Sequence, residues 1–116
     1  MISRQVETDM NRFLKGGDLK VIQGFVDSLN HDEVRALAVR NYIGCEIVHN
    51  DCNPGVQNDL DNLVSSHATN CSRMEDDELR SVIAGKNPDV VLGNLNTVLR
   101  CYQAYQAACQ KIGFNG

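Results

Sequence analysis

Five residues in the middle of the chain have side chains that bind transition metals: Cys45, His49, Cys52, His67 and Cys71. Cys45 and His49 are four residues apart, and His67 and Cys71 repeat that spacing. Residues four apart on a helix lie on one face, a turn from each other. Two such pairs facing each other would supply a tetrahedral site of two nitrogens and two sulfurs, for which zinc is the expected metal. The sequence therefore predicts a zinc site at Cys45, His49, His67 and Cys71, with Cys52 as a spare ligand.

Simpler interpretations of the same residues stay open. The sequence contains no C-x-x-C spacing, the usual mark of a zinc knuckle. His67 falls on an apolar seam and Cys45 on a buried face, so both also suit a protein core. A disulfide among these cysteines is a further alternative. However, the chain has five cysteines, an odd number, and no secretory signal is recognisable, so we expect a reducing, cytoplasmic location.

Catalytic chemistry finds little support in the residue pattern. A Cys–His pair such as Cys45 and His49 activates a thiol well only when a third group orients the histidine, and the sequence identifies no such group. The glycine-rich phosphate loop, the G-x-S-x-G turn and the H-E-x-x-H zinc motif do not occur in the chain. We therefore expect a protein that is not an enzyme.

The charges are distributed unevenly along the chain. Residues 46–78 contain eight acidic residues and one basic residue, a net charge of −7, although the whole chain carries only −4. Four of these acids are consecutive: Glu75, Asp76, Asp77 and Glu78. Such a cluster repels the phosphates of nucleic acid and suits a basic protein partner. The alternative is a solvated helix start that only keeps the protein soluble.

A helix-turn-helix outline is present near the end of the chain, where a helix over 75–85 is followed by a short break and another helix. The second helix would open with Pro88-Asp89-Val90-Val91-Leu92, which is acidic and then apolar. A helix that reads a DNA groove opens with polar and basic side chains. Nucleic-acid binding is therefore the less favoured alternative.

Helices must position all of these residues, because apolar residues recur at spacings of three and four and no segment alternates with period two. The chain has 116 residues, of which 42% are hydrophobic and 22% charged, as expected of one globular domain over residues 1–116. No apolar run is long enough to cross a membrane. The predicted helices span 3–15, 19–29, 31–49, 54–70, 75–85 and 88–112, with Asn30 and Glu33 as a capping box and glycines 17 and 113 as stops.

The last predicted helix carries the longest apolar seam. Its members alternate at spacings of four and three, the 3.5-residue period of helices packed along each other: Val91, Leu95, Val98, Tyr102, Tyr105, Cys109 and Ile112. Either this helix is the central post of a monomeric bundle, or its second half pairs with a second copy. In the second case the interface residues are Val98, Tyr102, Tyr105, Cys109 and Ile112, since tyrosine suits interfaces.

These patterns predict an all-α, compact bundle of five or six helices with the helix over 88–112 as its central post. The expected core residues are Phe13, Ile22, Phe25, Val34, Leu37, Leu60, Leu63, Leu79, Val82, Val91, Leu95 and Val98. The expected function is protein–protein interaction, as an adaptor, inhibitor or regulatory subunit of a bacterium or phage, without a cofactor. A zinc-stabilised form of the same module is the main alternative.

Overall fold

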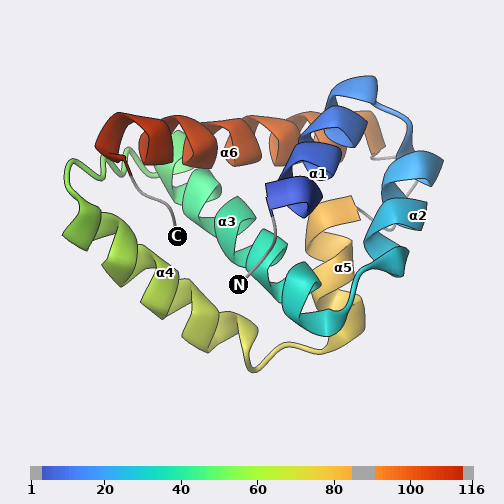
Figure 1. Cartoon of the computed structure of the whole chain (residues 1–116), viewed down its shortest axis with the longest axis horizontal. Coiled ribbons are helices and arrows are strands. Elements are labelled where there is room, and N and C mark those ends of the chain that lie inside the picture. The colour runs from blue at the N-terminus through green and yellow to red at the C-terminus, as the bar shows by residue number, and fades with distance from the viewer. Residues whose placement is uncertain (1–3, 85–90, 114–116) are drawn as a thin grey trace.

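The computed structural model of the chain describes residues 4–84 and 91–113, except the side chains of 91–96. Within these residues it contains six helices and no strand (Figure 1). The helices are α1 (Arg4–Gly16), α2 (Leu19–Ser28), α3 (His31–His49), α4 (Gln57–Cys71), α5 (Asp76–Ala84) and α6 (Val91–Ile112). The all-helical class predicted from the apolar spacing is confirmed.

Local sequence signals set several helix ends. The Asn30 side chain accepts a hydrogen bond from the backbone N–H of Glu33 at 2.9 Å, and the Glu33 carboxylate accepts one from the backbone N–H of Asn30 at 3.0 Å. This reciprocal pair is the predicted capping box of α3. Gly17 and Gly113 adopt φ values of 71° and 78°, the left-handed conformation in which glycine ends a helix. These predicted boundaries are confirmed.

One predicted helix start is wrong by three residues. α4 begins at Gln57 and not at Pro54, because the Asp59 carboxylate accepts hydrogen bonds from the backbone N–H groups of Gly55 and Val56 and so caps the helix there. α5 begins at Asp76, one residue after its predicted start. The predicted helix start at Pro88 lies outside the described residues.

Among the described helices, α3 is the most deeply buried. It packs against α4, α5 and α6, and five consecutive residues, 37–41, are all buried. A helix that is buried on all sides must lie inside the fold. α6 is the longest helix, but it lies along one side of α3 and also packs against α1 and α5 (Figure 1). The predicted role of the last helix as a central post is therefore not confirmed.

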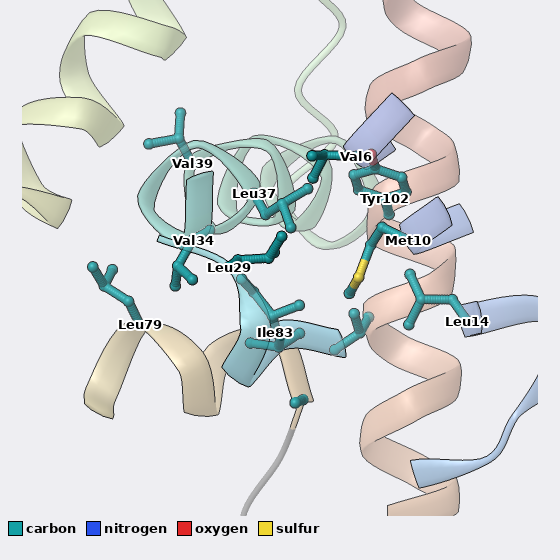
Figure 2. Packing of buried hydrophobic residues seen from close by; sticks show 14 of the residues in the cluster. Val6, Met10, Leu14, Leu29, Val34, Leu37, Val39, Leu79, Ile83 and Tyr102 are labelled. Atoms are coloured by element: carbon teal, nitrogen blue, oxygen red, sulfur yellow. The ribbon is translucent and has the colours of Figure 1, made fainter. Parts of the chain in front are cut away.

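The hydrophobic core draws side chains from every helix. Figure 2 shows Met10 and Val6 of α1 beside Tyr102 of α6, with Leu37 and Ile83 nearby. Six of the predicted core residues are buried: Ile22, Val34, Leu37, Leu60, Leu79 and Val98. Four others are partly buried: Phe13, Phe25, Leu63 and Val82. The side chains of the last two, Val91 and Leu95, lie outside the described residues.

Candidate functional site

The predicted acidic cluster surrounds the start of α5. Glu75, Asp77 and Glu78 are exposed, and Asp76 is half-buried. Carboxylates in the first turn of a helix are stabilised by the partial positive charge of its N-terminus, which explains why four acids are tolerated there. Asp76 is the member that turns inward, with its Oδ1 atom 2.9 Å from Nδ1 of His31. Three of the four predicted acids therefore carry charge that faces solvent.

Arg80 joins α5 to the C-terminus of α2. Its guanidinium donates to the Asp76 carboxylate at 2.5 and 3.3 Å, to the carbonyl of Leu29 at 3.0 Å and to the carbonyl of Val26. The carbonyl of Val26 already accepts a hydrogen bond from the backbone N–H of Leu29, so Arg80 adds a second donor there and supplies one to the carbonyl of Leu29. The hydrogen bond from Arg80 lowers the pKa of Asp76, and a weaker contribution comes from His31. Because these groups use the charge of Arg80, little of it is left for a ligand.

A hollow of about 180 Å³ lies between α2 and α5. Its lining consists of Gln23, Val26, Asp27, Asp77, Arg80, Ser81 and Ala84. Asp27 and Asp77 are exposed carboxylates from different helices, whereas the apolar lining residues Val26 and Ala84 are almost completely buried. Pockets for drug-sized ligands and cofactors measure roughly 300–1,000 Å³, so this hollow suits a single side chain better. We call this hollow, with the carboxylates of Asp27 and Asp77 that line it, the acidic α2–α5 surface.

The sequence analysis did not identify Asp27 as part of this surface. One signal was available, because Asp27 is an acid in the last turn of a predicted helix, where the negative end of the helix dipole disfavours it. A residue kept at a local cost often has a role elsewhere in the structure. The contact between α2 and α5, however, is not readable from the sequence.

The residues of the predicted zinc site do not come together. His67 Nε2 lies 3.0 Å from a Glu46 carboxylate oxygen, and Cys71 is fully buried in the core. His49 is exposed at the end of α3, while the Sγ of Cys45 faces α6. Within the described residues, no group of three or more histidine, cysteine or acidic side chains is arranged to hold a metal ion.

The reason is the arrangement of α3 and α4. The two helices form an antiparallel hairpin, in which the end of each helix lies beside the start of the other (Figure 1). His49 and Cys71 each occupy the last position of their helix. They therefore lie at opposite ends of the hairpin, although their spacing within each helix matches the prediction.

The seam predicted to pair two copies is buried within one chain. Tyr102 and Tyr105 are 2% and 4% exposed, Val98 is buried, and Cys109 and Ile112 are half-buried against the core. Burial raises the pKa of both tyrosine hydroxyls, so the hydroxyls remain protonated at neutral pH. A second copy has no access to these tyrosines unless the core opens.

A charged pair that the sequence analysis did not predict lies beside this seam. Arg40 is buried in α3, and its Nε donates to the Glu7 carboxylate of α1 at 2.8 Å. The guanidinium also lies 5.7 Å from the centre of the Tyr105 ring, within the range of a cation–π contact. These contacts hold α1 against α3 and α6. Because Arg40 is paired with Glu7 and stacks near Tyr105, we assign the cluster a structural role.

Comparison with known protein families, curated proteins and solved structures finds no match for this chain. Among the described helices, none is both long enough and apolar enough to span a membrane. The recognition helix of the predicted helix-turn-helix would begin at residue 88, outside the described residues. The side chains of residues 91–96, its next turns, also lie outside them. Function is therefore argued from the geometry of this chain.

Proposed function

We propose that this protein is a non-enzymatic interaction module, acting as an adaptor, inhibitor or regulatory subunit, whose acidic α2–α5 surface binds a basic segment of a partner protein. One observation carries the proposal: Asp27 and Asp77, from different helices, flank a hollow too small for most cofactors. A lysine or arginine side chain matches this hollow, because its charged head can form charge-assisted hydrogen bonds with the exposed carboxylates of Asp27 and Asp77.

The charge balance supports a basic ligand over an acidic one. Asp76 and Arg80 form an ion pair. Among the described residues, no basic side chain forms an ion pair with the exposed carboxylates of the surface. An exposed ion pair contributes at most about 1 kcal/mol. Binding therefore needs several basic residues in the partner, and salt should weaken it because exposed charges are screened within about 10 Å at 0.1 M salt.

The alternative functions receive less support. A homodimer through the second half of α6 requires Tyr102 and Tyr105 to leave the core, where they are almost completely buried. A zinc-stabilised module requires four residues that lie apart in the described structure. Over residues 97–112, the exposed side chains of α6 are mostly polar and include Arg100, Gln103 and Gln110.

A peptide-display selection against the immobilised protein tests the proposal. We expect the selected peptides to be rich in lysine and arginine, and their affinity to fall at least tenfold in the Asp27→Lys variant. Asp27 lies in the last turn of α2, where a lysine is favourable for the helix dipole, so this variant should fold normally. The matched control is Asp61→Lys, which makes the same charge change on the exposed face of α4.

Peptides without basic enrichment would refute the proposal. Equal binding to wild type and the Asp27→Lys variant would also refute it, because the hollow would then not be the binding site. If the Asp61→Lys control weakens binding as much as Asp27→Lys, the effect comes from net charge and not from the acidic α2–α5 surface.

A further inference from the structure

α3 and α6 approach each other most closely at Gly44. A Cβ atom placed on Gly44 would lie 1.7 Å from the carbonyl oxygen of Cys101 and 2.9 Å from its Cα atom. Only glycine admits the backbone of a second helix at such a distance. One residue along α3, the Sγ atom of Cys45 lies 2.8 Å from the Sγ atom of Cys101. This separation is only about 0.8 Å longer than a disulfide bond, whose length is about 2.05 Å.

We propose that Cys45 and Cys101 are a thiol pair that a low-molecular-weight disulfide, such as glutathione disulfide, oxidises to an intramolecular disulfide between α3 and α6. The proposal goes beyond the interaction function, because neither cysteine belongs to the acidic α2–α5 surface. A disulfide forms only between backbones that lie a few ångströms apart. α3 and α6 already approach each other this closely at Gly44. No large movement of either helix is needed.

The two thiols differ in access to solvent, and this difference assigns their roles. Cys45 is partly exposed, whereas Cys101 is 0% exposed. Burial, with a smaller contribution from the neighbouring thiol of Cys45, raises the pKa of Cys101 to about 12. The thiolate is the attacking form of a cysteine, so Cys101 is a poor nucleophile toward an external oxidant. Cys45 is therefore the thiol that reacts first.

Two exchange steps complete the reaction. The Cys45 thiolate attacks one sulfur of glutathione disulfide, forms a mixed disulfide and releases one glutathione thiolate, which takes up a proton. The Cys101 sulfur then attacks the Sγ of Cys45, the bond between Cys45 and glutathione breaks, and the departing glutathione sulfur takes up the proton of the Cys101 thiol. In total, the two protein thiols lose two electrons and two protons, and glutathione disulfide is reduced to two glutathione molecules.

The other three cysteines have different surroundings. Cys71 is enclosed in the core, and burial raises its pKa. Cys109 lies near Tyr105, and burial also raises its pKa. Cys52 is partly exposed in the segment between α3 and α4. Among the described cysteines, only Cys45 and Cys101 have sulfur atoms in contact with each other.

Peptide mapping of the purified wild-type chain tests the proposal. The protein is incubated with glutathione disulfide, free thiols are alkylated, and the digest is analysed by mass spectrometry without reductant. We expect a cross-linked peptide pair that contains Cys45 and Cys101, and alkylation of the other three cysteines. The disulfide closes the segment that holds α4 and α5, so the melting temperature should rise by about 10 °C and return after dithiothreitol treatment.

Variants make the assignment specific. Cys45→Ser should abolish the cross-link, and Cys52→Ser, at another partly exposed cysteine, should leave it unchanged. A stable mixed disulfide of glutathione at Cys45 would overturn the proposal, because it would show that Cys101 does not reach Cys45. A cross-link between any other two cysteines, or complete alkylation of all five, would overturn it as well.

Discussion

The contact between α3 and α6 at Gly44 can be tested with one methyl group. In Gly44→Ala, the new Cβ atom would lie 1.7 Å from the carbonyl oxygen of Cys101, so the helices must separate by roughly 1.7 Å to reach an ordinary contact of about 3.4 Å. Forcing an extra carbon into a packed contact costs about 3 kcal/mol, and the better helix propensity of alanine returns about 1 kcal/mol. The free energy of unfolding should therefore fall by about 2 kcal/mol.

Urea unfolding followed by circular dichroism at 222 nm measures this effect, with an expected decrease of about 1 M in the midpoint. Gly24→Ala is the matched control, because a Cβ atom at Gly24 meets nothing within 4 Å. Gly24 lies inside α2 and is exposed, so its alanine variant should gain about 1 kcal/mol. If Gly44→Ala unfolds at the wild-type midpoint or above it, α3 and α6 do not touch there. Cys45 and Cys101 would then not be close enough to form a thiol pair.

Three further predictions concern polar groups of the fold, each measured by urea unfolding. Glu7→Gln should lower the free energy of unfolding by about 2 kcal/mol, because the buried guanidinium of Arg40 loses its counter-charge. An unchanged free energy would mean that the ion pair does not stabilise the fold. Tyr102→Phe should be neutral or stabilising by up to about 1 kcal/mol, because the buried Tyr102 hydroxyl has no hydrogen-bond partner among the described residues, and a clear loss would reveal one. Asp76→Asn should destabilise at pH 7, and its difference from wild type should shrink as the pH falls below the ordinary pKa of 3.8. Arg80 lowers the folded-state pKa of Asp76, so the stabilisation is present above the ordinary pKa and is lost as the pH falls through the lowered value.

Much of the helical framework is readable from the sequence because its signals are local. The capping box of Asn30 and Glu33, the cap at Asp18 and the glycine stops at Gly17 and Gly113 each depend on residues within a few positions of each other. The start of α4 was mispredicted because more than one local cap was available, and the Asp59 carboxylate took the N–H groups instead of Asn53.

The candidate site was readable only in part. The consecutive acids before and within the first turn of α5 are visible in the sequence, but Asp27 joins them only because α2 packs against α5. The thiol pair was not predicted for the same reason. Cys45 and Cys101 are far apart in the chain, and their meeting depends on the crossing of α3 and α6 at Gly44.

By itself, the sequence determined which residues form helices and that the second half of α6 has an apolar seam. Only the tertiary structure decided what covers Tyr102 and Tyr105 within the chain, since α1 and α3 both pack against α6. It also decided that His49 and Cys71 lie at opposite ends of a hairpin instead of sharing a metal. The physical reason is that a spacing of three and four residues specifies which face of a helix is buried, whereas the partner of that face depends on contacts between distant segments.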